Sequence, residues 1–339
     1  MVTVHDVARA AGVSISTVSR ALAAPDRVAP HTRERVRAAA DELGYRPNRA
    51  ASVLRAGRTG AYGLVVPDLA NPYFAAVAKG AQARARERGA GLFVVDTEEN
   101  PDLEAEVLTS LAPQTDGVVL CSPRAVDRAL AVLGERPVVL VNHEADGVPA
   151  VETDHAAGMR RALEHLRALG HRRIAYVGGP ESSWSDRRRR AGLAAAAYDD
   201  VDVVALGAFR PQVEGGQAAA DLVVASGATA VITFNDLVAV GLVGRLRARG
   251  LDVPGDLSVV GCDDSYVASL VTPALTTLRV DLRAMGRAAV DLLVADDGVT
   301  AAPLDVDLVV RSSTAPPTPA PAAAATAAPT ETLVPGGTP

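Results

Sequence analysis

The chain has 339 residues, of which 48% are hydrophobic and 22% are charged, and its formal net charge is −6. This composition is typical of a soluble globular protein, and the length predicts two or three domains. The two cysteines, Cys121 and Cys262, lie far apart and form no CxxC motif, which excludes a secreted-type disulfide framework.

The start of the chain, MVTVHDVARAAGV, has charged residues where a signal peptide would have its apolar core. No uncharged stretch reaches the length that a bilayer span needs. We therefore expect a cytoplasmic protein without a membrane partner.

Positive charge is concentrated at the beginning of the chain. Residues 1–58 contain ten arginines and five acidic residues, whereas residues 59–339 contain 24 basic and 35 acidic residues. A basic surface attracts a phosphate backbone and an acidic one does not. Charge alone would equally fit a small helical bundle with incidental arginines, so the local pattern has to decide.

The first residues have the pattern of a helix-turn-helix. Thr3 can cap a first helix with Asp6 in its first turn, Gly12 ends that helix, and Ser14 can cap a second helix over 15–22. The arrangement predicts a second helix whose first side chains can enter a major groove.

A third helix is predicted over about 30–43. Pro30 suits its first turn and Gly44 suits its end.

The rest of the chain alternates short apolar strands with helical stretches rich in Ala and Arg. Such strands are typical of parallel sheets that are buried on both faces. We expect two α/β lobes, each with a doubly wound sheet, and a ligand between them at the carboxyl ends of the strands. The predicted strands are YGLVVPD, GLFVVDT, GVVLCS, PVVLVN, RIAYVGG, AVITFN and LSVVGCDD.

The segments DVARAAGVSISTVSRAL and TRERVRAAADELGYRPNRAASVL resemble the amino-terminal part of the LacI family of bacterial repressors. The resemblance covers nearly all of residues 3–314. It implies an α/β protein with an all-α helix-turn-helix head and a two-lobed body like that of periplasmic binding proteins. The implied limits are 1–45 for the head, 46–59 for a hinge, 60–314 for the effector-binding and dimerisation body, and 315–339 for a disordered Pro/Ala/Thr-rich tail. Lobe 1 would span about 60–154 and 280–308, and lobe 2 about 155–279 and 309–314.

The resemblance assigns DNA contacts in the head. Base-reading positions are Ile15, Ser16 and Arg20, because Arg can bind guanine and Ile can pack on a thymine methyl group. Phosphate-positioning groups fix the register without reading sequence. They would be Thr3, Ser14, Thr17, Ser19, Thr32 and Tyr45.

Two positions depart from the family. Ala23 stands where an Asn is common, and Ala29 stands where a Ser often caps the third helix. The missing cap should cost about 1 kcal/mol, partly offset by Pro30.

The hinge over 46–59 reads from its composition as a linker or a marginal short helix. By resemblance it folds on DNA, and Leu54 would wedge into the minor groove. Asn48, Ala51 and Arg55 would flank that wedge.

Candidate effector contacts follow the predicted strands, where aromatic rings can stack on a ligand and polar groups can bind hydroxyls. Asp154 and Asp236 are expected to be structural instead, and of Arg187–Arg190 only Arg189 should turn inward. Tyr73 and Phe74 belong to an NPYF turn. The candidates are Tyr73, Phe74, Asn142, Ser185, Arg189, Phe209, Asn235 and Asp263.

The resemblance implies a sequence-specific transcriptional regulator, a repressor of carbohydrate-utilisation genes that binds a pseudo-palindromic operator as a homodimer and is released by a sugar-like effector. A purine-type repressor that needs a corepressor stays open, as does a sugar-binding module without DNA function. The tail lacks a heptad repeat, which favours a dimer over a tetramer.

An enzyme is not expected. The motifs GxGxxG, GxxxxGK[ST], HExxH and GxSxG are all absent, so no cofactor, metal or nucleophile is predicted.

Overall fold

The computed structural model describes residues 2–23, 25–45, 59–295 and 302–318. The predicted hinge residues Asn48, Ala51, Leu54 and Arg55 lie outside these ranges. The chain divides into two compact units, Met1–Ala61 with Gln114–Asp116, and the remainder. Within the described ranges, no helix has the length and apolar character that a bilayer crossing requires.

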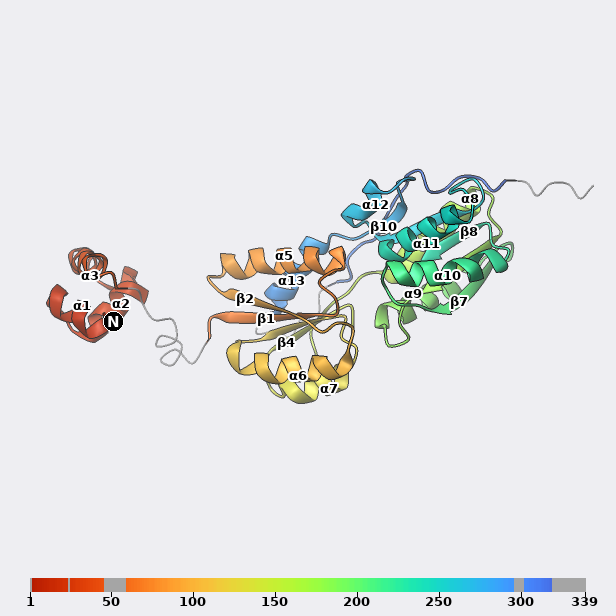
Figure 1. The fold of residues 1–339 in the computed structure, drawn as a ribbon. Coiled ribbons are helices and arrows are strands. Elements are labelled where there is room, and N and C mark those ends of the chain that lie inside the picture. The colour runs from red at the N-terminus through yellow and green to blue at the C-terminus, as the bar shows by residue number, and fades with distance from the viewer. Residues whose placement is uncertain (1, 24, 46–58, 296–301, 319–339) are drawn as a thin grey trace, which may run out of the picture. The chain divides into compact units, whose positions relative to one another are not determined.

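The first unit carries a head of three helices around a small aliphatic core (Figure 1). Val7, Val18 and Val36 are fully buried, one from each helix. A short 3-10 turn, Pro25–Arg27, precedes the third helix. The helices are α1 (Val4–Ala11), α2 (Ile15–Ala23) and α3 (Pro30–Glu42).

The helix ends in the head confirm the predicted caps. Both the backbone N–H and the hydroxyl of Thr3 donate to the carboxylate of Asp6, at 2.9 and 2.7 Å. Gly12 ends α1 with a left-handed φ of 62°, and Ser14 Oγ accepts from the N–H of Thr17 at 3.2 Å. Ala29 gives α3 no side-chain cap, as the sequence predicted.

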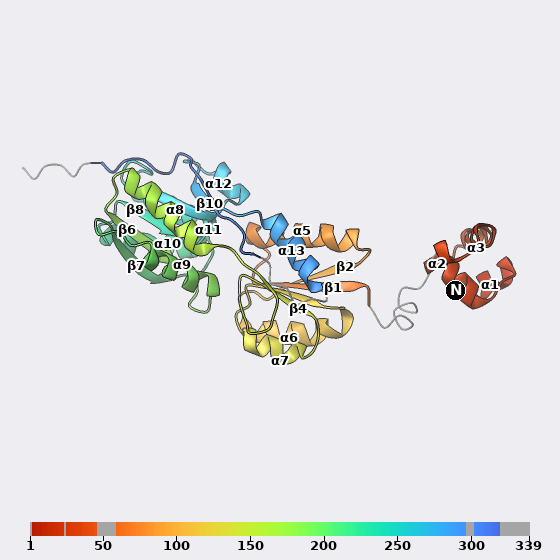
Figure 2. The ribbon, with the colours of Figure 1, turned by 180° about the vertical axis from the view of Figure 1, so that it is seen from behind.

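Lobe 1 contains a five-stranded sheet in the order β2-β1-β3-β4-β5. Helices α5 and α13 cover one face and α6 and α7 the other (Figures 1 and 2). The short strand β5 was not predicted, because two residues carry no periodicity. The elements are β1 (Ala61–Val66), α5 (Pro72–Glu87), β2 (Gly91–Asp96), α6 (Pro101–Leu111), β3 (Val118–Cys121), α7 (Val126–Leu133), β4 (Val138–Val141), β5 (Ala150–Val151) and α13 (Leu282–Leu293).

Lobe 2 contains a six-stranded sheet in the order β11-β10-β9-β8-β6-β7. Helices α8 and α9 pack on one face and α10 and α11 on the other. The elements are α8 (His155–Ala168), β6 (Arg173–Gly178), α9 (Trp184–Ala195), β7 (Asp202–Ala208), α10 (Val213–Ala225), β8 (Ala230–Thr233), α11 (Asp236–Ala248), β9 (Ser258–Asp263), α12 (Tyr266–Leu270), β10 (Thr276–Arg279) and β11 (Asp307–Val309).

The second sheet is not wholly parallel, unlike the prediction. Its last strand, β11, pairs antiparallel with β10. The chain has by then returned from lobe 1 and enters the sheet in the opposite direction. The two doubly wound sheets and the helical head otherwise confirm the predicted fold class.

The chain crosses between the lobes three times, before α8, before α13 and before β11. Two of these segments are tied together, because Thr153 and Leu304 form an isolated parallel bridge. The N–H of Leu304 donates to the carbonyl of Glu152 at 2.7 Å, and the N–H of Asp154 donates to the carbonyl of Leu304 at 3.0 Å. This ladder forms the hinge side of the space between the lobes.

Helices α5 and α13 approach so closely that only glycine fits at their contact. A Cβ on Gly80 would lie 2.1 Å from the carbonyl oxygen of Arg283, and one on Gly286 would lie 2.1 Å from that of Val77. Real Cβ atoms do not come so near, so both positions exclude a side chain unless the helices separate.

The prediction of a disordered tail from residue 315 is wrong for its first residues. The N–H of Ala315 donates to Ser258 Oγ at 3.0 Å, and Thr318 Oγ1 donates to the carbonyl of Gly255 at 2.7 Å. His171 Nε2 lies 2.9 Å from the carbonyl oxygen of Ala315. The segment is extended and finds backbone partners on lobe 2, which composition does not reveal; 319–339 lies outside the described residues.

Candidate functional site

A polar cavity lies where the strands of both lobes end at their carboxyl termini. Ten of its fourteen residues follow β1 and β3 in lobe 1 or β6 and β8 in lobe 2, the points where the strand order of each sheet reverses. Open α/β sheets bind ligands at such points. This cleft cavity is lined by Asn71, Tyr73, Phe74, Glu99, Ser122, Arg124, Asn142, Ser183, Ser185, Arg189, Pro211, Phe234, Asn235 and Asp263.

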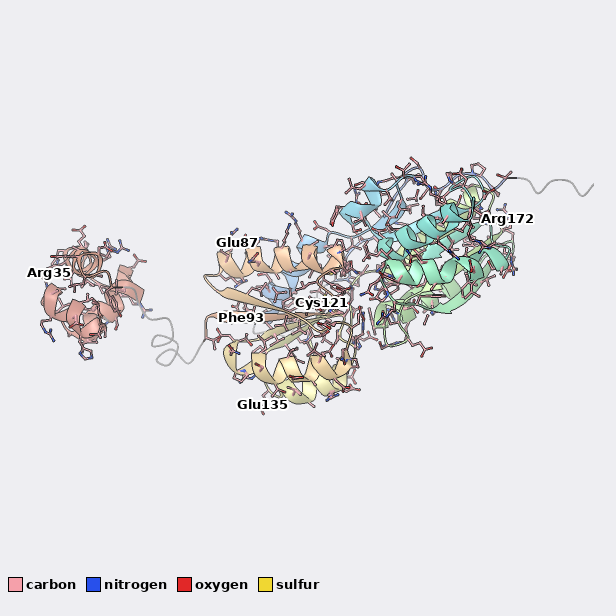
Figure 3. The ribbon with its side chains drawn as sticks, in the orientation of Figure 1. Arg35, Glu87, Phe93, Cys121, Glu135 and Arg172 are labelled. Carbon is pink, nitrogen blue, oxygen red and sulfur yellow. The ribbon has the colours of Figure 1, made fainter. Side chains whose placement is uncertain are left out.

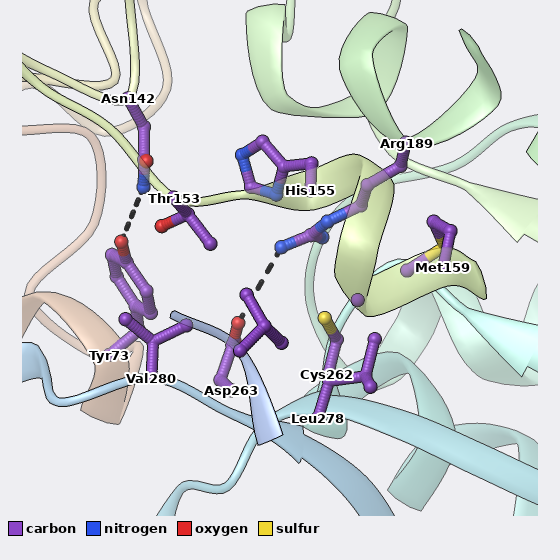
Figure 4. A pocket seen from close by; sticks show the side chains of 12 residues that line it. Tyr73, Asn142, Thr153, His155, Met159, Arg189, Cys262, Asp263, Leu278 and Val280 are labelled. Atoms are coloured by element: carbon purple, nitrogen blue, oxygen red, sulfur yellow. Dashed lines mark hydrogen bonds and ion pairs between the residues drawn. The ribbon is translucent and has the colours of Figure 1, made fainter. Parts of the chain in front are cut away.

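A second, inner cavity adjoins it on the side of the crossing segments (Figure 4). The two cavities share Tyr73, Asn142, Arg189 and Asp263. The inner cavity adds Thr153, His155, Gly158, Met159, Cys262, Leu278, Val280 and Val306.

Both cavities are small in this arrangement of the lobes. Their volumes are about 20 and 30 Å³ on the measure in which one water molecule needs roughly 10–15 Å³. The lobes therefore lie closed on a space for a few waters, and a drug- or sugar-sized ligand requires them to separate.

Four residues of the cleft cavity have left-handed backbone conformations that non-glycine residues rarely adopt. The φ angles are 58° for Glu99, 48° for Ser122, 50° for Asn142 and 110° for Asp263. Each residue ends or follows a strand, and such backbone strain accumulates at binding and catalytic sites. The strained backbone therefore makes the cleft a candidate functional site.

The NPYF segment is a helix start and not the predicted turn. Asn71 Oδ1 accepts from the N–H of Tyr73 at 3.0 Å, which caps α5. The hydroxyl of Tyr73 accepts from Asn142 Nδ2 and lies 3.2 Å from the sulfur of Met285. Burial raises the pKa of Tyr73 well above its ordinary value. Phe74 is buried, with its ring 5.0 Å from that of Tyr73 in an edge-on arrangement.

Lobe 1 contributes an ion pair that sequence reasoning missed. Arg124 Nε and Nη2 donate to the two carboxylate oxygens of Glu99, at 2.5 and 2.9 Å. The arginine side chain is 5% exposed and the glutamate 19% exposed. The two residues follow different strands, so no local motif joins them.

Lobe 2 contributes Arg189, which points inward while Arg187 and Arg188 are exposed, as predicted. Its Nη2 lies 3.8 Å from Asp263 Oδ1, and its Nη1 donates to the carbonyl of Phe234. The guanidinium covers the Phe234 ring, 4.8 Å from the centroid. Burial by itself would lower the pKa of Arg189, but Cys262 and Asp263 raise it above its ordinary value.

Asp236 and Asp263, two buried aspartates of lobe 2, differ in their hydrogen-bond partners. Asp236 accepts from Thr277 Oγ1 at 2.6 Å and from the N–H and hydroxyl of Ser265, at 2.8 and 2.9 Å. Burial still raises its pKa to about 6. Asp263 accepts no such hydrogen bond within the described residues and faces Arg189, and burial raises its pKa well above the ordinary value. Asp236 is thus structural, as predicted, and Asp154 is too, because it caps α8.

The remaining predicted contacts separate into three cases. Ser185 lines the cleft cavity. Asn235 also lines it, but caps α11 through Val238 and donates to the carbonyl of Pro211 at 2.8 Å. Phe209 lines neither cavity, which corrects the prediction for that residue. It packs against the apolar cluster under α10 and α11, because β7 lies at the edge of the sheet.

Three buried polar atoms of the described residues have no hydrogen-bond partner, and all belong to cavity residues. They are Asn142 Oδ1, His155 Nε2 and Arg189 Nε. Burial, followed by Arg189 and Arg188, lowers the pKa of His155 well below its ordinary value. A neutral His155 can donate or accept at Nε2, depending on its tautomer. The set can therefore bind a ligand that offers both donors and acceptors.

His155 was missed by the sequence reasoning. Its ring meets that of Trp184 edge-on at 6.0 Å, and His143 stacks on the same indole at 6.1 Å. A histidine directly after Asp154 reads as a helix start, and its position beside the cavity depends on the crossing segment.

In the head, the predicted base-reading residues Ile15, Ser16 and Arg20 are all exposed on α2. Arg20 Nε donates to the carbonyl of Ser16 at 3.3 Å, which holds the arginine along the helix. The guanidinium therefore stays on the face that Ser16 shares.

The predicted phosphate-positioning groups also have contacts within the head. The hydroxyls of Thr3 and Ser14 contact Asp6 and Thr17. Thr32 Oγ1 lies 3.1 Å from His31 Nε2, Ser19 is half-buried, and Tyr45 packs partly against the head core.

Metal and nucleophile chemistry find little support in the described part of the chain. No cluster of three or more His, Cys, Asp or Glu side chains there could hold a metal ion. Burial raises the pKa of both Cys121 and Cys262 to about 12, so neither is a ready thiolate.

Comparison with known proteins identifies both parts of the chain. Residues 3–48 match the family of bacterial regulatory proteins, lacI family, and residues 163–314 match the periplasmic binding protein-like domain. The transcriptional regulator DegA of Bacillus subtilis is 31% identical over 84% of this chain and 88% of its own length. The regulator MalR of Streptomyces coelicolor is 37% identical over 91% of this chain and 96% of its own length.

Two solved structures extend the similarity to the fold. The lac repressor dimer bound to operator and the anti-inducer ONPF has a TM-score of 0.82 and 31% identity, covering 93% of this chain and 99% of its own. The complex of the regulator CelR with cellobiose has a TM-score of 0.66 and 32% identity, covering 92% and 100%. The chain therefore belongs to the LacI family and is a DNA-binding transcriptional regulator with a helix-turn-helix head and a periplasmic-binding-protein-like body.

Proposed function

We propose that the protein represses carbohydrate-utilisation genes by binding a pseudo-palindromic operator as a homodimer, and that a sugar-like effector in the cleft releases it. The convergence of Asn142 Oδ1, His155 Nε2 and Arg189 Nε on adjoining cavities carries the effector part. Buried polar groups need partners, and vicinal hydroxyls supply donors and acceptors together.

In this proposal Tyr73, Phe74, Asn142, Ser185, Arg189, Asn235 and Asp263 contact the effector. Phe209 is left out because its ring packs under α10 and α11. The purine-type alternative loses support for the same reason, and because the Phe234 face is already covered by Arg189. The related CelR complex, which holds cellobiose, favours a saccharide.

Operator contacts are proposed at Ile15, Ser16 and Arg20 for base reading, with Thr3, Ser14, Thr17, Ser19, Thr32 and Tyr45 positioning phosphates. Asn48, Ala51, Leu54 and Arg55 would order on DNA, with Leu54 in the minor groove. The proposed limits are 1–45, 46–59 and 60–314, and a non-enzymatic, cytoplasmic protein fits the regulators to which the chain is similar.

The homodimer is supported by exposed apolar side chains on both lobes. Phe93 and Val94 are 47% and 37% exposed on β2, which is an edge strand of lobe 1 (Figure 3). On lobe 2, Tyr266 and Leu270 of α12 are 67% and 74% exposed. Burial of such residues between two copies would favour association. The related lac repressor structure is a dimer on its operator.

The test is a selection of duplexes from a random library, followed by competition binding. Wild type should prefer the selected duplex over random DNA by a factor of about 10³ or more. Arg20→Ala should lose about 1–3 kcal/mol of affinity for the selected duplex and relax its specificity. Arg35→Ala, an exposed arginine of α3, should weaken both kinds of DNA alike. Absence of any sequence preference in the wild-type protein would refute the proposal.

A further inference from the structure

We infer that Glu99 and Arg124 determine the charge of the effector: the pair admits uncharged hydroxylated ligands and rejects anionic ones such as phosphate esters. The inference rests on the proposed function and names residues that the sequence did not suggest. Its starting point is the ion pair on the lobe 1 wall of the cleft cavity.

The pair is held in place from several sides. The N–H groups of Arg124 and Ala125 donate to the carboxylate of Glu104, at 2.9 and 3.2 Å. Arg124 Nη1 donates to the carbonyl of Ser122 at 3.0 Å, and the N–H of Glu99 donates to the carbonyl of Pro67 at 2.8 Å. Glu104 is itself 2% exposed. The guanidinium therefore has little freedom to turn away from the carboxylate or toward solvent.

The arginine still has hydrogen-bonding capacity toward a ligand. A guanidinium has five N–H groups, and the bonds to Glu99 and Ser122 within the described residues use one on each nitrogen. One N–H remains on each terminal nitrogen, and the carboxylate of Glu99 keeps free lone pairs. A hydroxyl group can accept from the first and donate to the second.

An anionic ligand is disfavoured at the same place. The planar guanidinium would suit a phosphate, but Glu99 already occupies its Nε and Nη2 side in a bidentate pair. A phosphate group at the same place would have to displace the Glu99 carboxylate or lie beside it, which brings like charges together in a small, closed cavity. Like charges brought together at an interface oppose binding strongly.

The lobe 2 side of the cleft cavity does not add net positive charge. The charged residues that line the cleft cavity are Glu99, Arg124, Arg189 and Asp263, two of each sign. Burial raises the pKa of Asp263, but Arg189 at 3.8 Å acts in the opposite direction and favours its carboxylate form. The cavity as a whole therefore matches a ligand without net charge.

The matched variants are Glu99→Gln and Glu98→Gln in the full-length protein. Both remove one negative charge from the same loop, but Glu98 is exposed and lines neither cavity. Glu99→Gln leaves Arg124 without its carboxylate. It should bind inorganic phosphate about tenfold more tightly than wild type or Glu98→Gln at constant ionic strength. Isothermal titration and thermal shift measure this, and equal phosphate affinity in the three proteins overturns the inference.

A second arm uses the wild-type protein with pairs of ligands: glucose and glucose 6-phosphate, ribose and ribose 5-phosphate, and the neutral disaccharides cellobiose and maltose. A ligand that binds the native state raises the unfolding midpoint. Neutral members should do so and their phosphate esters should not. The inference is contradicted if a phosphate ester raises the unfolding midpoint more than its neutral partner does, or if no ligand of the panel raises it. This arm alone tests the inference if Glu99→Gln does not fold. Retained operator preference in that case would leave the DNA-binding function intact.

Discussion

Gln212 and Asp68 join the two lobes, because Gln212 Nε2 donates to Asp68 Oδ2 at 2.9 Å. Asp68 follows β1 in lobe 1 and Gln212 precedes α10 in lobe 2. The carboxylate is 8% exposed and also accepts from the N–H of Ala70 at 2.8 Å, so its position is fixed. A ligand too large for the closed cavity requires this bond to break.

Gln212→Glu should therefore open the cleft. Two carboxylates would face each other where an amide now donates, and a hydrogen bond to a charged group contributes about 1.5–3 kcal/mol. We expect a larger radius of gyration in solution scattering and faster amide exchange in the residues that line the cleft. Gln82→Glu, the same change at an exposed position of α5, serves as the control. Identical scattering from the two variants would show that the bond does not hold the lobes.

His155 should make the protein less stable in acid. Its folded pKa lies well below the ordinary 6.5 because of burial, so the unfolded chain takes up a proton first as the pH falls. The stability that the neutral ring contributes is present above pH 6.5 and is lost below it. In His155→Phe, which keeps an aromatic ring beside Trp184, the unfolding free energy should fall less steeply between pH 6.5 and 5.

Other titratable groups also affect the unfolding free energy at acid pH, but they are present in both wild type and His155→Phe. Burial also lowers the pKa of His143, His165 and His171, so the slope should shrink and not vanish. Asp236 acts in the opposite sense, because its folded pKa of about 6 favours the folded state at lower pH. Denaturant titrations at several pH values give the comparison, and parallel curves would exclude the role of His155.

Ala29→Ser should stabilise the first turn of α3. A serine at this cap position can accept from the N–H of Thr32, which now bonds only to the Ala29 carbonyl at 3.0 Å. The gain should be about 1 kcal/mol, or roughly fivefold slower amide exchange at the start of the helix. Ala38→Ser, the same change at an exposed interior position of α3, should be slightly destabilising. Equal amide exchange in Ala29→Ser and Ala38→Ser would contradict the prediction that α3 lacks a stabilising cap at residue 29.

Phe93→Asp should weaken self-association. Phe93 is 47% exposed on the edge strand β2, and a charge there cannot be buried against a second copy without a partner. Sedimentation should show a shift toward monomer, and operator affinity should fall with it. Leu222→Asp is the control, because Leu222 on α10 is 50% exposed and the variant shows whether a charge at any exposed apolar residue has the same effect. An unchanged dimer would remove β2 from the interface.

Local sequence rules predicted the elements because their causes are local. Thr3, Gly12, Ser14 and Gly44 cap or end helices, and the Val-rich runs became strands because both faces of each sheet are covered. The rules missed β5 and β10, which have two and four residues and are defined by their neighbours in the sheet, and they also missed the seven-residue edge strand β7. The pairing of strands that are distant in the chain cannot be predicted from a short stretch of sequence.

The candidate site was predictable where a residue follows a strong strand, as Asn142, Arg189 and Asp263 do. It was not predictable where two distant segments have to meet. Glu99 and Arg124 become partners only when β2 and β3 end at the same edge of the sheet. Phe209 was expected in the cavity, but its ring packs against the apolar cluster of α10 and α11, and Pro211 lines the cavity from the same segment.

The glycine contact between α5 and α13 also bears on the order in which the protein can be made. Gly80 and Gly286 are separated by some two hundred residues of chain, yet their helices pack against each other over the same face of the lobe 1 sheet. A ribosome has to release residue 293 before lobe 1 can close its core, by which time most of lobe 2 has already emerged. During synthesis the side of α5 that packs on α13 is consequently exposed to chaperones and proteases, and a fragment that ends before α13 lacks part of the cover on one face of its lobe 1 sheet.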